Sequence, residues 1–235
     1  MIFYILFMLF NALITTTGLL VILSFGLGIF SLIRNPKAKV VQLWFLLSMA
    51  VTIWSVGYVK SLLATESASG FLSLRIVYFG AALIPILYFH FVSTFLFLNK
   101  KFSYLIYTGY ALAFIFLILN TLTDLVIKGA KYLENFGYYE DVTNLGFKLF
   151  LAYFLFFAGF SIYLLFSVYR RSDGLRRRQI FYILLASLFG FLGGISNFVM
   201  DLTGSYPYGQ LIVWLYPLLI TYGIYIDEIK IKIKF

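Results

Sequence analysis

The sequence predicts an all-α integral membrane protein, built as a bundle of seven transmembrane helices. Of its 235 residues, 63% are hydrophobic and only 11% are charged, whereas a soluble domain is about 45–50% apolar and about 25% charged. A water-facing globule of this composition would lack the polar surface needed to cover its core. The apolar residues also run continuously instead of alternating, which excludes a membrane-spanning β-barrel.

Seven stretches are long and apolar enough to cross about 30 Å of hydrocarbon, which takes about 20 helical residues. Each ends at charged or turn-forming residues, such as Arg34-Asn35-Pro36-Lys37 after the first stretch. The first stretch is far longer than the roughly 7–15 apolar residues of a signal peptide, so we expect it to be a retained span. We expect one membrane domain, residues 1–235, with spans near 5–33, 40–60, 74–99, 102–123, 148–169, 179–201 and 207–226. The loop 124–148 is expected to hold a short helix or a hairpin.

The distribution of Lys and Arg predicts the orientation, because positive charge in short loops stays on the cytoplasmic side. With the N-terminus outside and the C-terminus inside, the cytoplasmic segments hold thirteen of the 18 basic residues. The net charge of +9 is therefore interpreted as a topology signal in a multi-pass protein of the cell (inner) membrane, and no nucleic-acid partner is expected.

Catalytic chemistry is not supported by the residues present. The chain has no cysteine, which excludes thiolate metal sites, and it has no Gly-rich phosphate loop, GxSxG or HExxH motif. We expect no catalytic residue, cofactor or metal. The last span has no lysine, so retinal attachment is excluded as well. The single histidine, His90, is expected within the third span, either as a neutral imidazole bonded to a neighbouring helix or as a functional group.

Polar and aromatic residues gather toward the outer ends of several predicted helices. This pattern is typical of an interfacial belt, and it also fits a ligand pocket that opens outward. Lys60 or Arg75 is expected to pair with Asp201 or Glu66 near that surface; Arg75 either pairs with Asp201 or reaches the interface without a partner. The candidate ligand or sensing cluster comprises Trp54, Tyr58, Lys60, Arg75, Tyr78, Asn197, Asp201 and Trp214.

Two further features concern packing and the cytoplasmic side. Ala186, Gly190 and Gly194 recur every four residues and form one smooth face, suited to internal packing or to a homodimer contact. Pro217 can kink the seventh helix and so make it a moving part. The 170–178 loop either lies against anionic headgroups or docks an acidic cytoplasmic partner. The candidate coupling residues are Arg170, Arg171, Arg176, Arg177, Arg178 and Pro217.

Several of these residues also form short motifs. The sequence has Phe71-Leu-Ser-Leu-Arg75-Ile-Val-Tyr78-Phe79-Gly80, then Phe89-His90-Phe91 after Pro85, and Tyr216-Pro217-Leu-Leu-Ile-Thr-Tyr-Gly223-Ile224 in the last span. Together with Trp54, these motifs resemble the seven-helix N-terminal membrane region of bacterial histidine kinases and related signalling proteins. The resemblance covers nearly the whole chain.

The resemblance implies a sensor of an extracytoplasmic or intramembrane stimulus. Its helix seven would relay the signal to a cytoplasmic kinase or other output domain, in the same or a separate chain. No phosphoacceptor histidine or nucleotide-binding segment follows residue 227, so we expect no kinase activity from this chain itself. The expected partners are the lipid bilayer, an output domain and a second copy of the chain. The alternative interpretation is a small transporter or channel.

Overall fold

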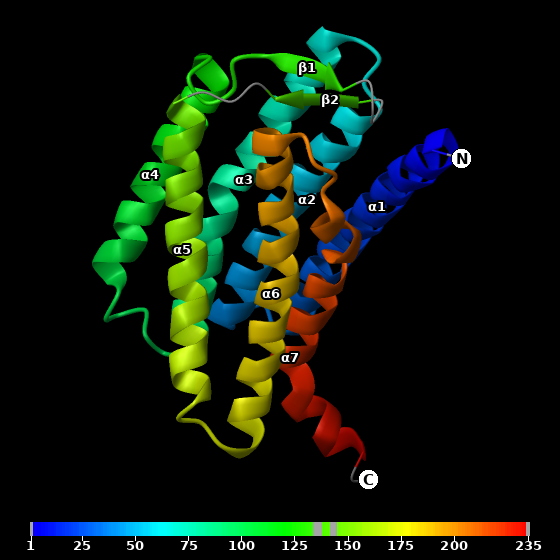
Figure 1. Ribbon diagram of the computed structural model, residues 1–235. Helices are drawn as coiled ribbons and strands as arrows, with labels where there is room; N and C mark the ends of the chain where they lie inside the picture. Colours follow the sequence, from blue (N-terminus) through cyan, green and yellow to red (C-terminus); the bar gives the residue numbers. More distant parts are fainter. Residues whose placement is uncertain (1, 134–137, 142–144, 234–235) are drawn as a thin grey trace.

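The structure, a computed structural model, describes residues 2–133, 138–141 and 145–233. Seven α-helices form its bundle (Figure 1). Side chains are described for residues 4, 7–133, 145–200 and 202–226. The α-helices are α1 (Ile2–Arg34), α2 (Lys39–Leu62), α3 (Ser67–Phe95), α4 (Ser103–Leu122), α5 (Leu145–Tyr169), α6 (Gly174–Thr203) and α7 (Leu215–Ile233). The first six have the length and apolar composition of membrane spans. The predicted all-α membrane fold is therefore confirmed.

The third helix begins and ends several residues earlier than predicted. At its start, the Ser69 hydroxyl donates to the Glu66 carbonyl at 2.9 Å and the Ser73 hydroxyl donates to that of Ser69, which lets polar residues continue a helix. At its end, Phe97 adopts a left-handed conformation with φ +62°, and the Leu98 amide donates to the Ser93 carbonyl. Glycine usually occupies the left-handed position at the end of a helix. Because phenylalanine occupies it here, the sequence does not indicate the turn.

The seventh span is divided in a way that the sequence analysis did not predict. A short 3₁₀ helix, η1 (Tyr208–Ile212), comes first, and α7 follows from Leu215. The apolar part of α7, Leu215–Ile226, is only about 18 Å long at 1.5 Å per residue. η1 therefore supplies the remaining depth of the span.

The two ends of the bundle differ in structure (Figure 1). One end, called here the hairpin end, carries the α2–α3 and α6–η1 connections and an antiparallel hairpin of β1 (Ala130–Leu133) and β2 (Tyr138–Asp141). The hairpin was one of the two alternatives expected for the 124–148 loop. The opposite end, the loop end, carries the α1–α2, α3–α4 and α5–α6 turns and the end of α7.

Close backbone packing joins the helices in two pairs. Two glycines let α2 and α3 approach closely. A Cβ atom on Gly57 of α2 would lie 2.6 Å from the Val77 amide nitrogen of α3, and one on Gly80 of α3 would lie 2.5 Å from the Trp54 amide nitrogen of α2. Small residues permit this approach. The second pair is α6 with α7 and η1, while α1 contacts α2 and α7, and α5 contacts α3 and α6. This arrangement leaves α2 and α3 facing α6 and α7 across the centre.

Candidate functional site

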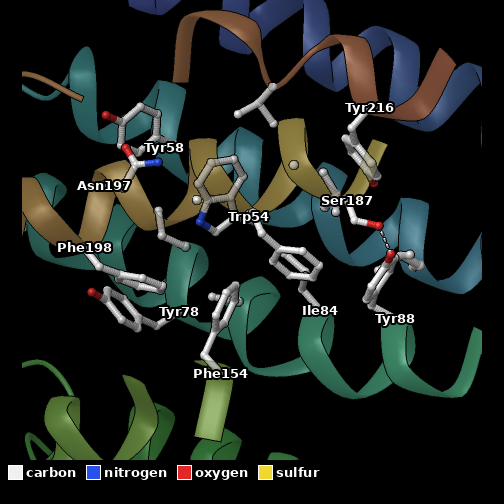
Figure 2. A pocket seen from close by; sticks show the side chains of 18 of the residues that line it. Trp54, Tyr58, Tyr78, Ile84, Tyr88, Phe154, Ser187, Asn197, Phe198 and Tyr216 are labelled. Atoms are coloured by element: carbon white, nitrogen blue, oxygen red, sulfur yellow. Dashed lines mark hydrogen bonds between the residues drawn. The ribbon is translucent and has the colours of Figure 1, made fainter. Parts of the chain in front are cut away.

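A cavity lies between the α2/α3 pair and the α6/α7 pair (Figure 2). The cavity has a volume of about 90 Å³, and the empty space with its open mouth included is about 990 Å³. The cavity reaches from Ser61, at the hairpin end of α2, to Leu47 deeper in the same helix, which is about 21 Å of helix.

The small residues of α6 explain why there is space here. Ala186, Gly190 and Gly194 all line the cavity. A Cβ on Gly190 would first meet Tyr216 at 3.5 Å, and one on Gly194 would meet only Phe154 at 3.9 Å. The smooth face predicted from sequence therefore lies inside the bundle, where it borders the cavity.

The walls near the hairpin end are aromatic. Trp54 and Tyr58 of α2 stack with ring centroids 5.7 Å apart and planes 11° apart, while Phe154 and Phe198 pack edge to face at 5.1 Å. None of the lining residues, all within the described part of the chain, carries a charge. Because a charge is costly to place in such surroundings, the cavity is suited to uncharged groups.

Two hydroxyl groups meet across the deep end of the cavity. Tyr88 of α3 and Ser187 of α6 form a hydrogen bond, drawn as a dashed line in Figure 2. The Ser187 hydroxyl also lies 2.6 Å from the Ile183 carbonyl, which can only accept. A hydroxyl has one hydrogen, so Ser187 donates to Ile183 and Tyr88 donates to Ser187. This bond links the two helix pairs directly.

A buried polar chain borders the cavity near Asn197 of α6. The Asn197 amide nitrogen donates to the Gly193 carbonyl at 3.2 Å and to Oε1 of Gln210 at 3.1 Å. Gln210 of η1 in turn donates through Nε2 to Oγ1 of Thr17 on α1 at 3.1 Å. Asn197, Gln210 and Thr17 are 8%, 1% and 0% exposed. The chain thus connects α6, η1 and α1 within the bundle.

The structure brings together half of the residues predicted as a ligand or sensing cluster. Trp54, Tyr58, Tyr78 and Asn197 all line the cavity. Lys60 is exposed, and Trp214 donates to the Leu211 carbonyl without lining the cavity.

The position of Asp201 relative to the cavity is not given, because the structure does not describe its side chain. Sequence analysis missed Tyr88, Ser187 and Tyr216, which are single polar or aromatic residues within apolar helices. The one available signal was Ser187, which directly follows the first residue of the smooth α6 face.

Arg75 holds the end of α4, a role that the sequence analysis did not predict; the side chain of its expected partner Asp201 lies outside the described ones. Its guanidinium donates to the carbonyls of Asn120 and Thr121 and to that of Thr123 at 3.3 Å, and it forms a 2.8 Å ion pair with Asp124. The carbonyls at a helix C-terminus lack partners within the helix and favour a cation. Arg75 therefore joins α3 to α4 and does not line the cavity.

The arginines among the candidate coupling residues lie at the loop end, whereas Pro217 lies near the start of α7. Arg176 donates to the Phe95 carbonyl and lies over the Phe95 ring, with its Cζ 4.2 Å from the ring centroid. It therefore caps α3 as Arg75 caps α4. The Arg177 guanidinium lies 4.8 Å from the Tyr169 ring, and that of Arg170 lies 6.0 Å from the Phe166 ring. Arg171 and Arg178 are exposed, and Pro217 is buried in α7.

His90, the single histidine of the chain, bonds to a neighbouring helix. Nδ1 of His90 lies 3.0 Å from the Tyr110 hydroxyl on α4, which confirms the expected hydrogen bond to a neighbouring helix. Within the described part of the chain, no three His, Cys, Asp or Glu side chains are placed to hold a metal ion.

Comparison with known families identifies the fold. The profile of a family described as the N-terminal 7TM region of histidine kinase matches residues 3–228. A comparison with the curated proteins gives no match. The match covers all seven helices, which agrees with a multi-pass membrane protein that acts as a sensory module. The chain belongs to the family of N-terminal seven-transmembrane regions of histidine kinases.

Proposed function

We propose that the cavity receives the stimulus and that α7 carries the response to a cytoplasmic output domain or partner. The observation that carries this proposal is the position of the cavity, which lies between two helix pairs, one of which contains α7. A sensor needs a stimulus site that borders the element that moves, and Tyr216 at the start of α7 lines the cavity.

The mechanism is a shift between two packings of the bundle. A ligand changes such an equilibrium only if it binds one packing more tightly than the other. The α2/α3 pair is in backbone contact at Gly57 and Gly80, so it moves as one unit. The α6/α7 pair faces it mainly through side chains, including the Tyr88–Ser187 bond. Occupancy of the cavity therefore changes the distance between the pairs.

The contacts of α7 at the loop end support the relay. The Tyr225 hydroxyl donates to the Ser31 carbonyl of α1 at 3.1 Å. The Arg34 guanidinium lies 5.0 Å from the Tyr225 ring centroid. These contacts hold α7 against α1 beyond Pro217, so a displacement at Tyr216 tilts the part of α7 that leaves the bundle.

The chain offers a direct test because it contains no cysteine, so pairs of spin labels can be introduced on their own. Lys100 lies in the α3–α4 turn. Labels at Lys100→Cys and Tyr222→Cys therefore report the distance between the loop end of α3 and α7, and labels at Lys39→Cys and Lys100→Cys report that between the loop ends of α2 and α3. Adding Gly194→Leu, which fills the cavity, should shift the first distance distribution and leave the control unchanged. An unchanged first distance would contradict the relay.

The relay also requires the hairpin end outside and the loop end in the cytoplasm of an inner-membrane protein. The thirteen basic residues of the predicted cytoplasmic segments support this orientation. A reporter fused after Arg178 should be cytoplasmic, and one inserted near Glu140 should be external. The reverse pattern would reject both the orientation and the relay.

The alternative interpretation, a small transporter or channel, predicts substrate flux through the purified protein in liposomes. A sensor predicts no flux above that of empty liposomes under conditions where the spin-label distance changes. Specific flux would favour the transporter.

A further inference from the structure

We propose that the cavity binds an uncharged, largely apolar molecule with one hydrogen-bond donor, and that this donor meets Oδ1 of Asn197. The proposal rests on the proposed function, because it names the class of ligand for the same cavity. It is carried by one unpaired acceptor and by the chemistry of the walls around it.

The acceptor is the side-chain oxygen of Asn197. This atom is buried, yet no donor among the described residues forms a hydrogen bond with it. The residue as a whole is 8% exposed and lines the cavity. A buried carbonyl without a partner is unfavourable, and deep in a membrane protein the solvent does not freely supply one. A bound molecule with a hydroxyl or amide hydrogen would satisfy it.

The identity of this atom as oxygen follows from its neighbours. Asn197 lies against two acceptors, the Gly193 carbonyl and Oε1 of Gln210, and only the amide nitrogen can donate to both. Gln210 is fixed in the same way, since its nitrogen donates to Thr17. Amide orientations are assigned from such networks, and reversing Asn197 would place its oxygen against the Gly193 carbonyl. The oxygen is therefore the atom left for a ligand.

The Tyr88–Ser187 pair at the deep end of the cavity offers no hydrogen to a ligand. The hydrogens of Tyr88 and Ser187 are both used, one in the bond between them and one in the bond to Ile183. Tyr216 turns its Cβ and ring toward Gly190, and its hydroxyl lies beside Ser24 of α1. The matching ligand therefore has a polar group at the Asn197 end and an apolar body toward Tyr88 (Figure 2).

Charged amphiphiles do not fit this description, because the lining residues offer no counter-charge. An aliphatic alcohol does. Such a molecule has two sources, a membrane lipid with a free hydroxyl or a diffusible long-chain compound, and both present the same donor and the same apolar chain.

The test compares dodecanol with its methyl ether, which keeps the chain and loses the donor. The purified protein is placed in nanodiscs of phosphatidylcholine, whose headgroup has no hydrogen-bond donor. Brominated forms of both probes quench nearby tryptophan, and the signal of Trp54 is the difference between the parent protein and Trp54→Phe. We expect the alcohol to bind about five-fold more tightly than the ether, the effect of one hydrogen bond. In Asn197→Leu, the two should bind equally.

Matched glycine variants localise the binding. Gly194→Leu projects into the cavity and should abolish quenching by both probes. Gly159→Leu, on an exposed position of α5 with no atom within 4 Å of a built Cβ, should leave quenching unchanged. Equal affinity for alcohol and ether in the parent protein, absence of quenching, or quenching that survives Gly194→Leu would each overturn the proposal.

A second arm separates the two sources. Dioleoylglycerol in the nanodisc should displace brominated dodecanol if the natural ligand is a lipid, and a lack of displacement assigns a diffusible one. Failure of the relay is distinguishable, because then the alcohol binds with its five-fold preference while the Lys100–Tyr222 label distance does not change. Failure of the ligand proposal leaves the response of that distance to Gly194→Leu intact.

Discussion

Arg75 on α3 and Asp124, just beyond the end of α4, form an ion pair of 2.8 Å in which the two side chains are 20% and 67% exposed. The arginine also holds the carbonyls that end α4, whereas the carboxylate only adds a solvent-facing partner.

The two members of this pair should therefore differ in their effect on stability. We predict that Arg75→Ala lowers the free energy of unfolding by about 2–3 kcal/mol, because several carbonyls lose a charged donor. Asp124→Asn should cost at most about 1 kcal/mol, as exposed ion pairs do. Thermal unfolding of the detergent-solubilised protein measures both. Equal effects would show that the ion pair, and not the capping of α4, is what matters.

The Tyr88–Ser187 bond predicts an asymmetry between its two partners. Ser187→Ala leaves the buried Tyr88 hydroxyl without an acceptor, which costs about 1–3 kcal/mol. Tyr88→Phe should cost less, because Ser187 keeps its bond to the Ile183 carbonyl. In the double variant, Tyr88→Phe with Ser187→Ala, the loss of unfolding free energy should approach that of Tyr88→Phe alone. A double-mutant cycle on unfolding free energies checks this, and additive losses would refute the assigned donor direction.

Arg176 and Arg178 provide a matched pair within the basic loop. Arg176→Gln should destabilise the protein by about 1–2 kcal/mol, because it removes the charged donor to the Phe95 carbonyl and the contact with the Phe95 ring. Arg178→Gln, at an exposed position, should change stability by less than about 0.5 kcal/mol. Chemical unfolding of both variants separates a structural arginine from a topological one. Similar losses would contradict the distinction.

Tyr206, in the connection from α6 to η1, predicts a pH effect. Burial, and to a lesser degree the neighbouring Tyr208, raises its pKa to about 12 from about 10 for a free tyrosine. Its hydroxyl donates to the Leu9 carbonyl at 2.7 Å. Since the folded state favours the protonated form, its contribution to stability is complete below about pH 10 and disappears as the pH rises through about 12. The stability advantage over Tyr206→Phe should fall across that window. A constant difference would show that Tyr206 does not titrate there.

The sequence predicted the number and approximate placement of the helices because apolar length is a strong signal. The prediction of helix boundaries failed where they depend on local backbone geometry. The Phe97 turn uses a residue that normally avoids left-handed backbone, and the division of the last span depends on η1 packing its Gly209 against the Leu192 carbonyl of α6, 2.7 Å from a built Cβ.

The candidate site was predicted in part for a similar reason. Trp54, Tyr58, Tyr78 and Asn197 lie toward the predicted outer ends of their helices, where polar and aromatic residues gather, so the sequence identified them. Arg75 and Ser187 required knowledge of which helices are neighbours. The charge of Arg75 suggested that it has a partner, but it did not indicate that α4 lies beside α3. Similarly, a single serine in an apolar helix does not indicate which tyrosine faces it.

The interlocked glycines of α2 and α3 have a mechanical consequence. Backbone atoms in contact cannot yield by rotating a side chain, so this half of the bundle is stiff. The α6/η1 half has a backbone contact of the same kind at Gly209, whereas the side chains that border the cavity between the halves can change rotamer. A force applied to the bundle, whether from a bound molecule or from the surrounding bilayer, therefore deforms the cavity before it separates Gly57 from Val77. Chemical and mechanical inputs would act along one shared coordinate, the width of the space in front of Trp54.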